Sequence, residues 1–277
     1  MARNGKNNRQ QITTAVHDAA IKRIGFLGIT ADMIDGRGLT RIISHHIEKG
    51  TRCVVGYHNL HSIFLYHRDK KMRVFYRLCR VIHIDGMPLI FWARALGLKA
   101  ERRHRITYMD WIFSFMEQAA QNGWRVFYLG AMPGVAARGA DVLRLRSPGL
   151  HLETAHGHFN CHPGHPENEA VIRQIKAARP HILLVGMGMP RQEHWIVANH
   201  SLLDAPIILT CGGCINYLAG VVPLPPRWLG QVGLEWLFRL LTEPRRLWKR
   251  CLWEPWYMVP LFLSDLRKTY GKKIRES

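Results

Sequence analysis

The sequence predicts an α/β protein with a mostly parallel sheet flanked by helices and followed by a C-terminal appendage. Short apolar runs, typical of buried strands, alternate with stretches of helical periodicity along most of the chain. Glycine, proline or acidic residues follow many of these runs and mark turns. Beyond Pro226 the pattern changes to basic residues interleaved with aromatic ones, which predicts a basic, aromatic helical appendage.

The individual elements follow from these patterns. Strands are predicted over residues 24–29, 52–57, 82–84, 125–130, 151–155, 182–185 and 207–210. Helices are predicted over residues 39–47, 62–78, 88–96, 107–120, 135–146 and 168–178. The run 182–185 is almost continuously apolar, as in a parallel strand that is buried on both faces. This alternation predicts a Rossmann-like sheet.

Composition indicates a folded chain with an unusual charge. The 277 residues are 47% hydrophobic and 21% charged, which excludes a largely disordered protein. The 39 Lys and Arg against 20 Asp and Glu give a net charge of +19. Such an excess predicts a polyanionic partner, namely a nucleic acid, an anionic membrane surface or a phosphorylated substrate.

We expect three segments: a flexible basic arm over residues 1–20, an α/β catalytic domain over 21–226, and the appendage over 227–277. No signal peptide is expected, because the first residues contain no apolar stretch. The six cysteines follow no regular framework, which favours a reducing compartment. In the appendage, the positive charge favours docking on a membrane surface over a purely structural aromatic face.

The centre of the predicted site is the turn that begins with Asp85 and Gly86, directly after a strand. Ligands of open α/β sheets bind outside the carboxyl ends of the strands, so a carboxylate at this point can work on a substrate. An ordinary solvated turn residue is the competing interpretation of Asp85.

Glycine-rich turns follow two other strands. Gly130 precedes a predicted helix, and the free N–H groups at its start can bind phosphate. Gly186 and Gly188 allow close backbone approach, and Gln192 follows them with an amide that both donates and accepts. None of these turns has the spacing of a nicotinamide-binding fingerprint, which disfavours a nucleotide-dependent oxidoreductase.

Histidine and cysteine clusters give weaker signals. The histidines between His151 and His165, with Cys161, lack the spacing of known zinc sites, so no metal is predicted. Cys211 and Cys214 fit a redox pair, but their position after an apolar strand favours buried, inert thiols.

Several motifs in combination carry a family resemblance. They are Asn59 after a strand, Asp85-Gly86, Arg105-Ile106-Thr107, Gly157-His158-Phe159, the run Gly186–Glu193, Pro226-Arg227-Trp228, the run Gly233–Leu240 and Glu243-Pro244-Arg245-Arg246. Over about residues 25–250 the chain resembles the WecG/TagA/CpsF family of bacterial glycosyltransferases.

The resemblance implies an inverting, metal-independent transfer of a hexose from a UDP-sugar to a polyprenyl-diphosphate-linked saccharide, without a cofactor. It implies Asp85 as the general base, with Arg239 and Arg246 as further catalytic residues. The residues expected to bind substrate are Asn59, His58, Arg105, Thr107, Gly130, Gly186, Gly188, Gln192, Glu193, Arg227, Lys249 and Arg250. The appendage is expected to close the site and meet the membrane. The expected location is therefore cytoplasmic, on the inner face of the plasma membrane, and a homo-oligomer is left open.

Two departures from the family pattern bear on the sugar. Tyr57-His58-Asn59 stands where Thr-Pro-Asn is usual, and Tyr108 stands where the family has glycine. A glucose-type and an N-acetylmannosamine-type donor therefore both remain open. The alternative from another class is a basic nucleic-acid-binding α/β protein without catalytic activity, although no known nucleic-acid-binding motif occurs here.

Overall fold

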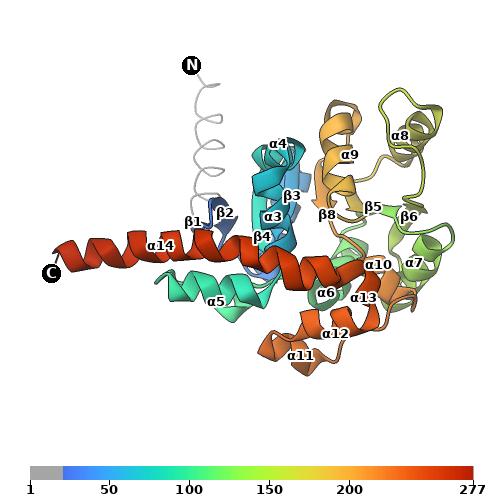
Figure 1. Ribbon diagram of the computed structural model, residues 1–277. Coiled ribbons are helices and arrows are strands. Elements are labelled where there is room, and N and C mark those ends of the chain that lie inside the picture. Colours follow the sequence, from blue (N-terminus) through green and yellow to red (C-terminus); the bar gives the residue numbers. More distant parts are fainter. Residues whose placement is uncertain (1–20, 277) are drawn as a thin grey trace, which may run out of the picture.

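The computed structural model describes residues 21–276, apart from the side chains of residues 227, 231, 232 and 272–276, and contains a six-stranded sheet between layers of helices (Figure 1). The predicted basic arm over residues 1–20 lies outside the described residues. The strands are β3 (Cys53–His58), β4 (Cys79–Ile84), β5 (Arg125–Gly130), β6 (His151–Ala155), β7 (Ile182–Gly186) and β8 (Ile207–Thr210). They are ordered β4-β3-β8-β7-β5-β6, and every neighbouring pair is parallel. The predicted Rossmann-like fold class is confirmed.

Two apolar cores bury the two faces of this sheet. One face is covered by α2 (Gly36–Lys49), α6 (Tyr108–Gln121), α7 (Val135–Arg146) and α10 (Cys214–Leu218). The other face is covered by α4 (Lys70–Leu78), α8 (Pro166–Ala178) and α9 (Arg191–Asn199). The chain therefore continues from β3 to α4 on one face of the sheet, and from the neighbouring strand β8 to α10 on the other face. In open α/β sheets, ligands bind at the carboxyl ends of strands where such a change of side occurs.

Two predicted elements differ in the structure. The predicted first strand is a hairpin of β1 (Arg23–Phe26) and β2 (Ile29–Asp32), which forms a separate antiparallel sheet. The helix predicted over residues 62–78 is two helices, α3 (Leu60–Arg68) and α4. Asp69 lies in an extended conformation between them, and its carboxylate accepts the N–H of Lys71 at 2.7 Å, so a helix start interrupts the periodic pattern.

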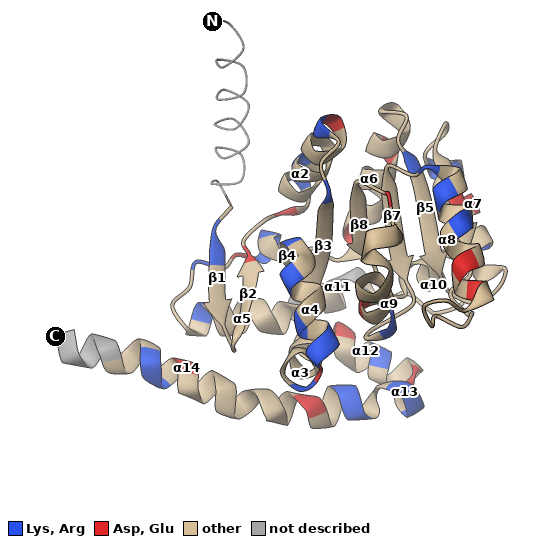
Figure 2. Cartoon of the chain, turned by 90° about the horizontal axis from the view of Figure 1, so that it is seen from above, with Lys and Arg blue, Asp and Glu red and all other residues tan. Residues whose placement is uncertain are grey.

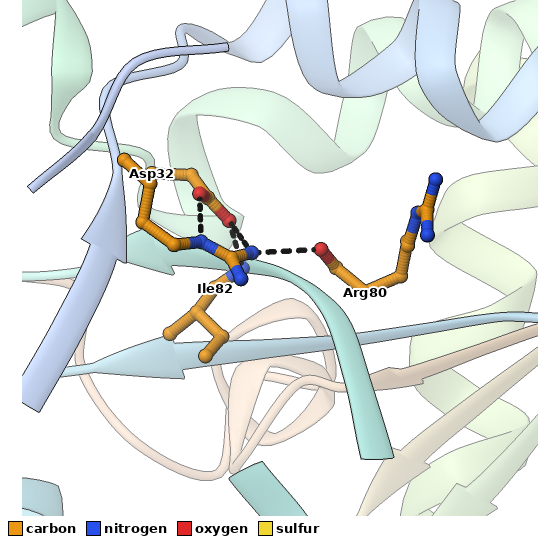
Figure 3. A network of polar contacts seen from close by, with 4 residues as sticks. Asp32, Arg80 and Ile82 are labelled. Carbon is orange, nitrogen blue, oxygen red and sulfur yellow. Dashed lines mark hydrogen bonds and ion pairs between the residues drawn. The ribbon is translucent and has the colours of Figure 1, made fainter. Parts of the chain in front are cut away.

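The buried carboxylate of Asp32 fixes the hairpin to the edge strand β4 (Figure 3). It accepts from Arg23 Nε at 2.7 Å, from Arg23 Nη2 at 2.9 Å and from the backbone N–H of Ile82 at 2.8 Å. Arg23 Nη2 also donates to the carbonyl of Arg80 at 2.9 Å. Asp32 therefore has a structural role in holding the strand that leads to Asp85.

The appendage begins with α11 (Arg227–Val232), α12 (Glu235–Thr242) and α13 (Pro244–Trp248). A π-helical turn over Lys249–Trp253 then leads into the long helix α14 (Glu254–Glu276). This last helix lies against α3 and α5 (Met87–Ala95) (Figure 1). At these contacts Tyr257 meets Phe64 and Phe262 stacks on Trp92. Among the described residues, no helix combines the length and apolarity needed to cross a membrane. The division of the chain at residue 226 stays a prediction.

Candidate active site

Asp85 lies at the carboxyl edge of the sheet, one residue beyond β4. Its backbone N–H donates to the carbonyl of His58 at 2.8 Å, which continues the pairing of β4 with β3. The residue as a whole is half-buried, and burial of its carboxyl group raises the pKa from 3.8 to about 6, although Arg239 and Arg105 act to lower it. A carboxylate in this range is ionised near neutral pH and still basic enough to take a proton.

Three arginines from separate segments lie near this carboxylate. Arg105 continues the edge of the sheet, because the next residue, Ile106, donates its N–H to Ile84 at 2.8 Å. Arg239 comes from α12 and Arg250 from the π-helical turn, and all three lower the pKa of Asp85. The tertiary fold therefore gathers positive charge around one carboxylate.

These guanidinium groups are only partly satisfied within the protein. Arg105 Nη2 donates to Glu235 Oε2 at 2.5 Å, while its buried Nε has no hydrogen-bond partner. The Arg239 guanidinium lies 5.4 Å from the ring centroid of Tyr217, and its buried Nε also lacks a partner. Among the described residues, Arg250 has no ion-pair partner. Buried donors of this kind are suited to an anionic ligand.

Arg246 and Lys249 lie farther out on the appendage. Arg246 is exposed and forms a two-point ion pair with Glu243, at 2.6 and 2.7 Å. Lys249 is exposed over the ring of Trp248, 5.4 Å from its centroid. The predicted catalytic role of Arg246 and the binding role of Lys249 stay predictions.

Asn59 and His58 have clear structural tasks at the end of β3. The Asn59 side chain accepts the N–H of Ser62 at 3.0 Å and caps α3, and it lies beside the turn at Gly86. His58 is buried, stacks on Tyr76 at 4.1 Å and bonds the Ser62 hydroxyl at 3.0 Å. Burial lowers the pKa of His58 to about 3, so this ring is neutral in the core. The structure brings Asn59, and not the His58 ring, to the site.

Gln192 ties together the turns that follow β7 and β8. Its carboxamide oxygen accepts the N–H of Gly188 at 3.2 Å and that of Gly212 at 3.1 Å. Its amide nitrogen donates to Glu193 Oε1 at 2.7 Å, and both side chains are fully buried. Burial raises the pKa of Glu193 to about 7, and its Oε2 atom has no hydrogen-bond partner. Gln192 thus holds the turns after β7 and β8 in place, and Glu193 holds the Gln192 amide. The predicted contact of both residues with substrate stays a prediction.

Glycine is needed for different reasons at the positions that follow the strands. A Cβ added to Gly130 would lie 2.3 Å from the carbonyl oxygen of Gly186, and one added to Gly186 would lie 2.2 Å from the Tyr128 hydroxyl. Both glycines therefore allow neighbouring strand ends to pack together. Gly188 has φ +80° and open space around it. Its N–H is bound by Gln192, so the turn is preformed.

The remaining predicted positions lie around this region. Thr107 caps α6, and its hydroxyl donates to Asp110 Oδ2 at 3.1 Å. Arg227 begins α11, but its side chain lies outside the described residues. In the part of the chain that the structure describes, no three His, Cys, Asp or Glu residues are grouped as metal ligands. The metal-free site stays a prediction. Cys211 and Cys214 are free and buried, and burial raises the pKa of Cys211 well above its usual value.

Sequence reasoning missed three residues of the site. Tyr57 is buried beside His83, and the charges of Asp85 and Arg250 act on its phenol. Glu235 holds Arg105, and Tyr217 lies under Arg239. The departure from the usual motif marked Tyr57 as unusual. The other two pair with residues far away in the sequence, which no local pattern reveals.

The fold and the site together define an α/β protein with a carboxylate among arginines at the carboxyl edge of a parallel sheet. The chain belongs to the glycosyl transferase WecG/TagA/CpsF family, whose sequence model matches residues 24–272. It is 27% identical over 175 residues to the N-acetylglucosaminyldiphosphoundecaprenol N-acetyl-beta-D-mannosaminyltransferase of Staphylococcus aureus strains NCTC 8325 / PS 47 and COL, and 26% identical to that of strain MRSA252. Each match covers 63% of this chain and 65% of the relative, just under two thirds of the relative's length.

Proposed function

We propose that this protein is an inverting, metal-independent glycosyltransferase. It moves a hexose from a UDP-sugar to a polyprenyl-diphosphate-linked saccharide in bacterial surface or exopolysaccharide biosynthesis. The observation that carries this proposal is the Asp85 carboxylate, with its raised pKa, among Arg105, Arg239 and Arg250. Family membership supports sugar transfer, and the name of the relatives, which specifies a diphosphoundecaprenol-linked sugar, supports a lipid-linked acceptor.

Asp85 acts as the general base of the transfer. It takes the proton from the acceptor hydroxyl while the hydroxyl oxygen forms a bond to the anomeric carbon of the donor. The bond from that carbon to the diphosphate oxygen breaks on the opposite side, so the configuration inverts and UDP leaves. The pKa of about 6 suits this role, because the group is mostly ionised at neutral pH.

The arginines stabilise the leaving group. Negative charge grows on the diphosphate as the bond breaks, and guanidinium groups fixed in advance lower the energy of that state. Arg239 and Arg250 supply this charge from the appendage, and Arg105 supplies it from the edge of the sheet. The ion pair of Arg105 with Glu235, at 2.5 Å, links the sheet edge to α12 and so helps to place Arg239.

The appendage also provides the proposed contact with the membrane. Trp253 and Trp256 are 70% and 72% exposed, and Leu252 beside them is 52% exposed. Figure 2 shows basic residues on α13 and along α14, the helices on either side of the turn that contains Leu252 and Trp253. Exposed tryptophan with flanking positive charge is typical of a protein that docks on an anionic lipid surface. Docking on the inner face of the plasma membrane would bring the site to its lipid-linked acceptor.

The decisive experiment is a donor screen with the purified full chain and a short-chain polyprenyl-diphosphate-linked N-acetylglucosamine. UDP release is measured with UDP-glucose, UDP-N-acetylmannosamine and UDP-N-acetylglucosamine, each with and without acceptor and in the presence of EDTA. Acceptor-dependent UDP release with one donor is expected. If no UDP-sugar gives acceptor-dependent release while the protein binds DNA tightly at physiological salt, the nucleic-acid-binding alternative replaces the proposal.

A further inference from the structure

The inward face of the last segment of the chain is apolar with three charged exceptions. Leu247 and Met258 on this face are buried, with exposed fractions of 5% and 0%. The charged residues that share their helical spacing are Arg250, Glu254 and Asp265. Charged groups on a buried face need a partner, so each one indicates a specific contact.

Two of the three charges bind elements of the sheet domain. Asp265 Oδ2 accepts the backbone N–H of Leu27, in the hairpin, at 2.6 Å. Glu254 Oε2 is bound by His61 Nδ1, in the first turn of α3, also at 2.6 Å. The side chains of His61 and Glu254 are only 15% and 10% exposed. Both contacts hold α14 in place, but only the second lies next to the candidate active site.

The third charge, Arg250, lies one helical turn before Glu254. Side chains four residues apart lie on the same side of a helix, and a carboxylate and an arginine at that spacing readily pair. Burial lowers the pKa of Arg250, and the charge of Glu254 acts against this lowering, so the two groups are within electrostatic reach. They nevertheless form no ion pair with each other, and Oε2 of the Glu254 carboxylate is engaged by His61 instead.

We propose that His61 is a positioning residue of the active site. By binding Glu254, it keeps this buried carboxylate away from Arg250 and leaves the Arg250 guanidinium available to the anionic ligand beside Asp85. The identity of that ligand, the diphosphate of the donor, rests on the function proposed above. His61 also follows Asn59 by two residues, so one short segment both borders the Asp85 turn and controls the appendage arginine.

This inference predicts an unusual order of activities among three variants. In His61→Ala the freed Glu254 carboxylate pairs with Arg250 and neutralises it, so kcat falls on the order of tenfold to hundredfold. UDP affinity, measured by calorimetry, falls in the same variant. In His61→Ala/Glu254→Gln the competing charge is gone, so kcat and UDP affinity recover to the level of Glu254→Gln alone. A double variant whose kcat and UDP affinity are as low as those of His61→Ala, or lower, would overturn the inference. If the contact between His61 and Glu254 only held α14 in place, removing the Glu254 charge as well could not restore activity.

Asp265→Asn is the matched control, because it weakens the other contact of the same helix with the sheet domain. Its kcat is expected to stay within about twofold of the wild type, a change worth well under 1 kcal/mol. A loss equal to that of His61→Ala would assign the effect to loosening of α14 and overturn the inference.

The two proposals fail in different ways. If the wild type transfers sugar but the double variant does not recover, the role of His61 is wrong and the enzyme activity stands. If UDP affinity follows the expected order but no donor is transferred, the proposed function is wrong and the role of His61 stands. A wild type that does not bind UDP overturns both.

Discussion

Arg105 lies beside Asp85 because the segment that carries it pairs with the last residue of β4. The N–H of Ile106 donates to the carbonyl of Ile84 at 2.8 Å, so a residue with a carboxylate and a residue with a guanidinium group lie next to each other at one strand end. Backbone hydrogen bonds fix the positions of the two residues, and the ion pair of Arg105 with Glu235 holds the guanidinium group. The appendage then needs to bring only Arg239 and Arg250 to complete the site.

Asp85→Asn is expected to abolish transfer and to retain UDP binding. The amide has nearly the same shape but cannot accept the proton, so kcat falls on the order of 10² to 10⁴-fold. The dissociation constant of UDP, measured by calorimetry, stays close to that of the wild type or decreases, because a negative charge near the diphosphate has been removed. Near-normal turnover by this variant would exclude Asp85 as the base.

The rate of transfer is expected to rise with pH through about 6. Burial raises the pKa of Asp85 above 3.8, so at pH 5 most molecules hold the protonated, inactive form. A profile of kcat/KM from pH 4.5 to 8 with the UDP-sugar identified in the screen tests this point. His61→Ala shifts the midpoint upward if Arg250 loses its influence on Asp85. A flat profile across pH 5 to 7 in the wild type would show that the catalytic base has another pKa.

Glu193→Gln is expected to stabilise the protein at alkaline pH. Burial raises the pKa of Glu193 from 4.5 to about 7, so the native state binds more protons than the unfolded state between these values. The stability that Glu193 contributes is therefore present below pH 4.5 and is lost as the pH rises through 7. The variant has no such loss, and at pH 8 the gain in free energy of unfolding is on the order of 2 kcal/mol. Melting temperatures at pH 5 and pH 8 test this, and a difference between variant and wild type that shrinks with pH contradicts it.

Trp253→Ser/Trp256→Ser is expected to weaken binding to anionic vesicles by about tenfold or more, because two large apolar side chains no longer enter the lipid interface. Cosedimentation with vesicles of phosphatidylglycerol and phosphatidylcholine measures this change. Leu145→Ser is the matched control, because Leu145 is 82% exposed on α7, outside the appendage. Equal binding of the tryptophan variant and the control would remove the appendage from the proposed membrane contact.

The strands of the sheet and the position of Asp85 at a strand end were predictable because they depend on local patterns. Apolar runs located all six strands of the parallel sheet, and the turn after one of them identified Asp85. The hairpin at residues 23–32 was missed because Leu27 and Gly28, both with positive φ, turn the chain inside an apolar run. The burial of the His58 ring was missed because β3 extends one residue further than predicted and is buried on both faces up to His58.

Contacts between distant segments were beyond the reach of the sequence. Glu254 and His61 are 193 positions apart, and nothing near either residue predicts that they meet. Similarly, Glu235 appears in the sequence as an ordinary helix-start acid, yet it binds Arg105, 130 positions earlier. These pairs depend on how the appendage packs against the sheet domain, which is a property of the tertiary structure.

The position of the appendage arginines has a consequence for protein synthesis. A ribosome completes all six strands of the parallel sheet and Asp85 before it adds Arg239 and Arg250. The growing chain therefore has its proposed base long before the cations that would make it a catalyst. Under the proposed function, a nascent chain at that stage is expected not to consume a nucleotide sugar, and activity is expected only once α14 has packed onto α3.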